Sequence, residues 1–159
     1  MTDADNITIV SAEPEDLEAV LKLQHLAFQS EAELLANKSI PPLLETLADV
    51  ENQYRNGVAF LKAITATDRI VGSVRGRIEN KTLHIGKLIV HPDWQGRGIG
   101  GHLLCAIEER FPNFRYELFT GVRSDRNIKL YEKFGYKCFA QKITENGIHM
   151  VYLEKSGSS

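Results

Sequence analysis

The sequence has few of the features that mark a secreted, membrane-bound or metal-binding protein. Its 159 residues contain two cysteines, Cys105 and Cys138, which stand far apart and have no metal-ligand neighbour at a usable spacing. No apolar run approaches the ~18 residues that a membrane-spanning helix needs, and the acidic first residues lack the basic and then apolar order of a signal peptide. These absences exclude a disulfide framework and a cysteine metal site, and they predict reduced core thiols in a cytoplasmic protein.

Charge of one sign is also missing. The 19 Lys and Arg residues against 21 Asp and Glu give a net charge of -2, so no global basic field predicts binding to nucleic acid. Hydrophobic residues make up 43% and charged residues 25% of the chain, which is ordinary for a globular domain. The length fits one domain, predicted over residues 1–155, and the small polar residues 156–159 predict a disordered tail.

Hydrophobic periodicity, together with the positions of proline and glycine, predicts alternating strands and helices. Helices are expected from residues 11–14 through Phe28, from Pro41 to Gly57, from the glycine-rich loop to Arg110, and from Ser124 to Gly135. Strands are expected at residues 7–10, 58–65, 70–78, 82–90, 116–122, 136–144 and 148–154. Short polar connections favour antiparallel hairpins, whereas a strand, helix, strand crossover requires a parallel pair. The predicted fold is a single α/β domain with a mixed, mostly antiparallel sheet and helices on its faces, in the order β-α-α-β-β-β-α-β-α-β-β.

The strand at 82–90 leads into an unusual loop. Four glycines occupy six positions, at residues 96, 98, 100 and 101, and a helical pattern follows directly. Glycines let the backbone approach a ligand closely, and the free N–H groups at a helix N-terminus point toward an anion. The loop therefore predicts a binding site for a phosphate-bearing ligand.

Two familiar phosphate motifs fit this loop poorly. A Walker A loop ends in Gly-Lys-Ser or Gly-Lys-Thr, whereas this loop ends in Gly100-Gly101-His102. Gly96, Gly98 and Gly101 match the dinucleotide fingerprint G-x-G-x-x-G letter by letter. In that fold, however, the glycine turn follows its strand at once and the next strand ends in an acid. Here five residues intervene and the next strand ends at 120–122 without an acid, which disfavours a nucleotide-binding oxidoreductase.

A third pattern fits the loop and its surroundings together. Gln95, Gly98 and Gly100 form Gln-x-x-Gly-x-Gly, and residues 127–136 contain Leu-Tyr-x-x-x-Gly-Tyr. On these two motifs the chain resembles the GCN5-related N-acetyltransferase (GNAT) family, which binds the pyrophosphate of acetyl-CoA with such a loop. The resemblance runs from Ile7 to Glu154 and includes the element order. It implies the acyl-CoA N-acyltransferase fold, acetyl-CoA as cofactor, and transfer of an acetyl group to a primary amine of a small molecule or peptide.

The resemblance also implies which residues bind the cofactor. In the family, the strand before the loop and the next parallel strand splay apart, and the pantetheine arm bonds the backbone of the first strand. Arg97 adds a charge-assisted contact to a phosphate. Family members often carry asparagine seven residues before the tyrosine, but here that place is Ser124, so Asn127 is either a cofactor contact or a helix cap. The predicted cofactor-binding residues are Leu88, Ile89, Val90, Gln95, Gly96, Arg97, Gly98, Ile99, Gly100, Gly101 and Asn127.

Catalysis requires an acid for the departing thiolate and a base for the amine. Tyr131 lies where the family often places a tyrosine near the CoA sulfur, and the reference pKa values of a phenol and a thiol differ by only ~1.5 units. His84 lies where some members carry a catalytic glutamate, and it is either the base or a structural histidine. Glu31 and Glu33 are weaker candidates for the base or for amine binding.

Three further residues bear on the acceptor. Ser73, Arg75 and Arg77 alternate and share one strand face. They either line an acceptor cleft, in which case the acceptor carries negative charge, or form a solvated face.

The overall prediction is direct attack of the amine in a ternary complex, because neither cysteine lies in a setting that would activate it as a nucleophile. The predicted partners are acetyl-CoA and an amine acceptor, with no nucleic acid and no membrane. An acyl-CoA-binding sensor or regulatory protein without turnover is the alternative. The last two strands could pair between two copies, so a homodimer is a further hypothesis. The sequence contains no signal that identifies the acceptor.

Overall fold

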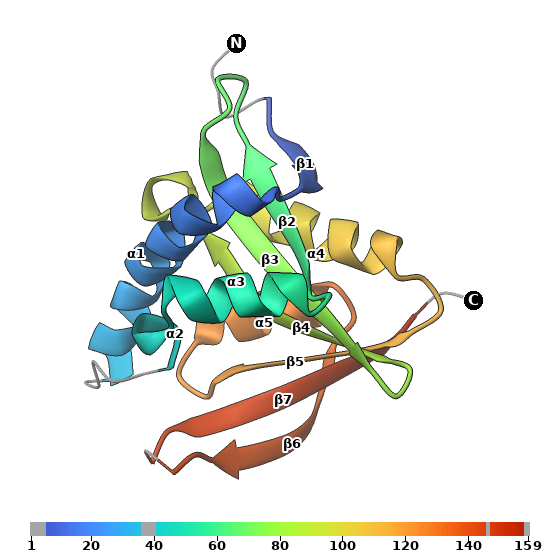
Figure 1. Ribbon diagram of the computed structural model, residues 1–159. Coiled ribbons are helices and arrows are strands. Elements are labelled where there is room, and N and C mark those ends of the chain that lie inside the picture. The colour runs from blue at the N-terminus through green and yellow to red at the C-terminus, as the bar shows by residue number, and fades with distance from the viewer. Residues whose placement is uncertain (1–5, 36–40, 146, 158–159) are drawn as a thin grey trace.

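The computed structural model describes residues 6–35, 41–145 and 147–157, with side chains described outside residues 30–42. Within these residues seven strands form one sheet in the order β1-β2-β3-β4-β5-β7-β6 (Figure 1). The strands are β1 (Thr8–Ser11), β2 (Ala59–Ile64), β3 (Ile70–Glu79), β4 (Thr82–Val90), β5 (Arg115–Gly121), β6 (Lys137–Ile143) and β7 (His149–Ser156). Neighbouring strands are antiparallel except β4 and β5, which confirms the predicted mixed, mostly antiparallel sheet.

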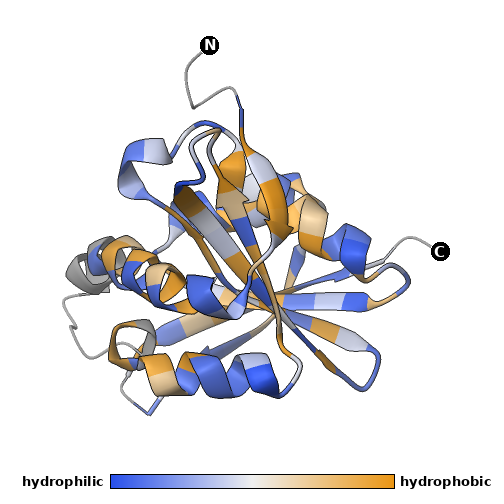
Figure 2. Ribbon diagram, turned by 45° about the horizontal axis from the view of Figure 1, so that its top comes forward, coloured by the Kyte–Doolittle hydropathy of each residue, from blue (hydrophilic) through white to orange (hydrophobic). Residues whose placement is uncertain are grey.

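Helices cover both faces of this sheet, as predicted. They are α1 (Leu17–Leu35), α2 (Pro41–Leu44), α3 (Leu47–Arg55), α4 (Ile99–Arg110) and α5 (Asp125–Lys133), with 3-10 turns η2 (Pro14–Asp16) and η3 (Pro92–Trp94). The core lies between the sheet and α4, where Val74, Leu83 and Ile107 are fully buried. A smaller cluster around Val50 and Phe60 joins α1 and α3 to the other face. Figure 2 shows apolar and polar residues mixed along the strands, and six consecutive residues of β3 are buried because helices cover both faces of the sheet.

The helix predicted from Pro41 to Gly57 is broken in the structure. Thr46 caps α3: its hydroxyl accepts a hydrogen bond from the Asp49 amide at 3.2 Å, and its own amide donates to the Asp49 carboxylate at 2.9 Å. This reciprocal capping stabilises a helix start at Leu47 and ends α2 before it. The break leaves Glu45 outside both helices, with its side chain directed into the protein.

β4 departs from regular pairing on both of its sides. On the β3 side the register shifts between Ser73 and Arg75, and Lys87 at the irregularity has a φ of 50°. On the β5 side the paired residues in the described chain are Thr82, Leu83 and His84 of β4, opposite residues 115–117. Beyond His84 and Glu117 the two parallel strands separate, so Ile89 and Val90 are paired with β3 on one side and not with β5 on the other.

The C-terminal region shows two differences from expectation at residue level. β7 continues through Ser156, and the Gly157 amide donates to the Phe114 carbonyl at 2.7 Å; residues 158–159 lie outside the described residues. Cys138 was expected in the core, but it is exposed because β6 is an edge strand with few buried residues. The hairpin turn predicted at 146–147 closes between Thr144 and Ile148, although Asn146 lies outside the described residues.

Among the described residues, no helix has the length and apolarity to cross a membrane.

Candidate active site

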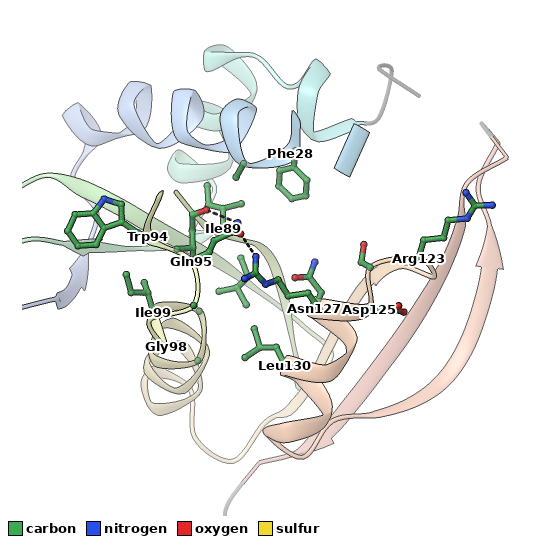
Figure 3. A pocket seen from close by; sticks show the side chains of 18 residues that line it. Phe28, Ile89, Trp94, Gln95, Gly98, Ile99, Arg123, Asp125, Asn127 and Leu130 are labelled. Carbon is green, nitrogen blue, oxygen red and sulfur yellow. Dashed lines mark hydrogen bonds between the residues drawn. The ribbon is translucent and has the colours of Figure 1, made fainter. Parts of the chain in front are cut away.

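A cavity of about 540 Å³ opens where β4, the glycine-rich loop and the N-terminus of α5 meet (Figure 3). α1 closes one side with Ala27 and Phe28, and α5 forms the other with Asn127 and Leu130. Of the predicted cofactor residues, the cavity is lined by Leu88, Ile89, Val90, Gln95, Gly96, Gly98, Ile99, Gly100, Gly101 and Asn127. The structure thus brings these residues to one place, and their contact with a cofactor stays a prediction.

The loop geometry explains why glycines are required here. Gly96 and Gly98 have φ values of 79° and 81°, and Gly98 is the N-cap of α4. A side chain at a positive φ is strained, whereas glycine adopts it at little cost. The first turn of α4 therefore faces the cavity with backbone N–H groups that no preceding helical turn can bond, which favours an anion there.

Gly101 has a different reason for being glycine. A Cβ built at this position would lie 2.6 Å from Cζ of Phe134, at the end of α5. The absence of a side chain lets α4 and α5 pack closely, and this packing places the start of α5 at the rim of the cavity.

Arg97 does not line the cavity. Its guanidinium carbon lies 4.7 Å from the centre of the Trp94 ring, so it stacks on a side chain that is itself buried beneath the loop. The phosphate contact predicted for Arg97 stays a prediction, and it would require the side chain to leave this ring.

Two other arginines do line the cavity. Arg123 and Arg126 flank the start of α5, beside Asp125. Arg126 donates a hydrogen bond to the Gln95 side-chain carbonyl, which links α5 to the loop across the cavity and is drawn as a dashed line in Figure 3. The amide nitrogen of Gln95 lies 3.5 Å from the Val90 carbonyl. Sequence reasoning missed both arginines, although their position at a helix start after the second parallel strand was the available signal.

Asn127 and Tyr131 lie one turn apart on α5 but have different surroundings. The Asn127 side chain donates to the Thr120 hydroxyl at 3.2 Å and lines the cavity, so it joins α5 to β5 and does not cap the helix. Tyr131 is 5% exposed and packs on Tyr136, with ring centres 6.1 Å apart. Tyr131 is not among the lining residues, and its predicted role as an acid stays a prediction.

His84 lies at the point where β4 and β5 separate. Its Nδ1 atom is 3.6 Å from the Glu117 carboxylate, and Glu117 also accepts a hydrogen bond from Arg115 at 2.8 Å. The histidine does not line the cavity, but it stands at the closed end of the gap between the strands. The carboxylate can orient the imidazole ring, and a histidine is a side chain that commonly serves as a general base. Glu117 is the partner that sequence reasoning did not identify.

Ser73, Arg75 and Arg77, which alternate along β3, match neither expectation: they form no fully solvated face, and they do not line an open acceptor cleft. Ser73 donates to the Leu61 carbonyl at 2.8 Å, and exposed Arg77 pairs with Glu79. Arg75 is 4% exposed and donates to the Glu45 carboxylate at 2.9 Å. The side chains of Glu31 and Glu33 lie outside the described residues.

Glu45 is the centre of a buried polar cluster with Gln24, Gln53 and Arg75. Its carboxylate accepts hydrogen bonds from Gln24 at 2.9 Å and Gln53 at 2.7 Å, and both glutamines also accept from Arg75. Burial raises the pKa of Glu45, but the hydrogen bond from Gln24 and the charge of Arg75 outweigh burial and hold that pKa below its usual value. The carboxylate is therefore ionised inside the protein.

No group of three or more His, Cys, Asp and Glu side chains that could hold a metal ion occurs in the part of the chain that the structure describes.

An open pair of parallel strands beside a glycine-rich loop and a helix N-terminus is an arrangement that favours a bound anion. Residues 30–156 match the family model described as an acetyltransferase (GNAT) domain. The chain therefore belongs to the GNAT acetyltransferase family, as its two motifs indicate.

Solved structures share this fold over nearly the whole chain. The ribosomal-protein-S18-alanine N-acetyltransferase of Escherichia coli superposes with a TM-score of 0.78 at 16% identity, covering 96% of this chain and 95% of that one. The PaiA N-acetyltransferase of Thermoplasma acidophilum, in complex with coenzyme A, gives 0.72 at 18% identity over 95% and 99% of the two chains.

A curated relative in Bacillus subtilis (strain 168), UPF0157 protein YqkA, is 25% identical over 119 residues. This match covers 74% of the present chain and 34% of YqkA, so the chain spans about a third of the length of that relative.

Proposed function

We propose that the protein is an acetyl-CoA-dependent N-acyltransferase, with residues 1–155 as its acetyltransferase domain, that transfers an acetyl group to a primary amine of a small molecule or peptide. The observation that carries the proposal is the cavity itself. It combines the N-terminus of α4, the loop glycines and one free edge of β4. The presence of coenzyme A in the PaiA structure supports the same ligand here.

The two ends of the cavity suit different parts of acetyl-CoA. The backbone N–H groups from Gln95 to Gly100 would hold the pyrophosphate, where the helix dipole also favours negative charge. Ile89 and Val90 pair with β3, whereas β4 pairs with β5 at residues 82–84, so the β5 side of residues 88–90 can bond an amide-containing arm laid in the gap. A backbone N–H there would also polarise the thioester carbonyl.

Acetyl-CoA supplies the activated acetyl group, and the chain's residues handle the protons. In this proposal His84, supported by Glu117, accepts the proton of the attacking amine, directly or through water, and Tyr131 protonates the leaving thiolate. A covalent route through cysteine is disfavoured, because neither Cys105 nor Cys138 lines the cavity and burial raises the pKa of Cys105.

The test is release of free CoA thiol with a panel of primary amines. The panel comprises polyamines, amino acids, aminoglycosides and peptide N-termini. The proposal predicts acetyl-CoA binding together with amine-dependent thiol release. Tight binding without turnover on any amine would instead favour the sensor, and stabilisation by NAD or NADP but not by CoA would favour an oxidoreductase.

Arg126 is expected to contribute to cofactor binding. Replacing Arg126 with alanine should raise the dissociation constant for acetyl-CoA by about 10-fold. A charge-assisted hydrogen bond to phosphate contributes roughly 1.5–3 kcal/mol, but Arg126 must give up its bond to Gln95 to make it, which reduces the net gain. Isothermal titration calorimetry measures this, with Arg97→Ala as the matched control. A larger loss in Arg97→Ala than in Arg126→Ala would support the predicted phosphate contact of Arg97 and contradict that of Arg126. Dephospho-CoA separates the two phosphate positions: it should bind the variant and the parent equally if Arg126 contacts the 3′-phosphate.

A further inference from the structure

The face of the sheet that α1 and α3 cover contains an unbalanced set of charges. Arg75 and Lys87 are cations, and Glu45 is the carboxylate that acts on both. Arg75 is bonded to Glu45, whereas Lys87 makes no hydrogen bond or ion pair with any residue that the structure describes. Burial lowers the pKa of Lys87, while Glu45 opposes this effect and Arg75 adds to it. Among the described side chains, the cluster therefore holds two cations and one carboxylate.

The cluster also has an unused hydrogen-bond donor. The Nε atom of Arg75 is buried and lacks a partner among the described residues, although the two terminal nitrogens are bonded. A buried donor without a partner is costly, and so is a half-buried cation that forms no ion pair among the described residues. An anion bound beside Lys87 would reduce the cost of the unpaired charge.

The bulge in β4 accounts for the position of Lys87. Leu83 and Ile85 before the irregularity pack on the α4 side, and Leu88 and Val90 after it pack on the same side. One residue is therefore inserted between them, and Lys87 takes the left-handed backbone conformation that a lysine rarely adopts. Without the bulge, Leu88 and Val90 would change faces. Strained residues of this kind cluster at functional sites.

Lys87 stands between the two parts of the proposed active site. Leu88, the next residue, begins the cavity lining, and His84 lies three residues before it at the closed end of the strand gap. Three strand residues span at most ~10 Å. The pyrophosphate would lie eight or more residues further along the chain, at the loop, so a cofactor phosphate does not account for this cation.

We propose that the amine acceptor is a small molecule bearing a carboxylate, such as a free amino acid, and that Lys87 binds this carboxylate while the amine faces His84. This inference rests on the proposed function. A carboxylate carries one negative charge and so matches the single excess positive charge, whereas a phosphate dianion would exceed it.

The experiment compares acceptors that differ only in the carboxylate: arginine with agmatine, and lysine with cadaverine. Parent protein, Lys87→Met and Lys87→Arg are assayed for kcat/KM, with Lys22→Met on the exposed side of α1 as the matched control. The parent and the control should prefer each amino acid by at least ~10-fold, as a hydrogen bond to a charged group implies. Lys87→Met should lose the preference because its kcat/KM on the amino acids falls, and Lys87→Arg should retain much of it.

Calorimetry with the CoA-bound protein compares the binding of each amino acid with that of its decarboxylated amine, and it does not depend on turnover. If no acceptor is turned over, the proposed function fails, and the binding preference still tests the inference. Equal or tighter binding of the decarboxylated amines, or a Lys87→Met protein that keeps the preference, would overturn it. Removing a partly buried charge should not lower the urea midpoint, so a folding defect is separable from a loss of recognition.

Discussion

Replacing Glu45 with alanine is expected to lower the free energy of unfolding by about 3–5 kcal/mol, because it leaves the buried guanidinium of Arg75 without its carboxylate. Arg75 is buried, with 4% of the residue accessible to solvent, so water cannot replace the lost carboxylate. Gln24 and Gln53 would each lose an acceptor as well. Urea unfolding followed by circular dichroism measures the loss. Such a change is a large part of the stability of a domain of this size.

The control for this substitution is Glu51→Ala, an exposed acid on α3, which should change stability by less than about 0.5 kcal/mol. Adding Arg75→Met to Glu45→Ala should recover much of the loss, since no buried charge then remains unpaired. The parent should also lose stability on acidification. The folded-state pKa of Glu45 lies below its unfolded value, so its contribution is present above the unfolded pKa and disappears as the pH falls through the folded one. Glu45→Gln should lack this part of the pH dependence.

Replacing Tyr131 with phenylalanine is expected to lower kcat by about 10²-fold, the low end of what a positioned acid contributes. The dissociation constant for acetyl-CoA should be unchanged, because the substitution keeps the ring that packs on Tyr136. Steady-state kinetics at several pH values with one good acceptor measure kcat, and calorimetry measures acetyl-CoA binding.

Tyr136 offers a matched control for this experiment. Its hydroxyl donates to Glu108 at 2.8 Å, and burial together with Glu108 raises its pKa far above the usual value. Tyr136→Phe removes a buried hydroxyl of the same kind and should reduce stability by about 1 kcal/mol without a comparable loss in kcat. Equal activity of Tyr131→Phe and the parent across the pH range would assign Tyr131 to packing alone.

The features predicted correctly from the sequence are those encoded by neighbouring residues. The strands, the helices and the glycine-rich loop were predicted from patterns among residues that lie close together in the sequence. These patterns are strand alternation, helix periodicity and the run from Val90 to Gly101. The family motifs then connected the loop to the block around Tyr131. The insertion of β7 between β5 and β6 follows from no local signal.

The features missed depend on contacts between distant residues. Glu45 and Arg75 are 30 positions apart, and Gln95 and Arg126 are 31 apart. Propensity favoured one helix from Pro41 onward, yet the cap at Thr46 and the burial of Glu45 divide it. The bulge at Lys87 could not be predicted either, because residues 82–90 read as one ordinary strand. It becomes evident only when the structure shows which face of the sheet the residues before and after Lys87 occupy.

The short pairing between β4 and β5 is expected to affect local opening of the sheet. The described sheet consists of a block from β1 to β4 and a block of β5, β7 and β6, paired with each other over three residues of β4. Partial opening between these blocks disrupts little of the sheet, so it is an expected route to proteolysis and hydrogen exchange. A ligand that bonds β4 on one side and α5 on the other connects both blocks and suppresses this opening in proportion to its occupancy. Coenzyme supply would then govern the lifetime of the protein as well as its turnover.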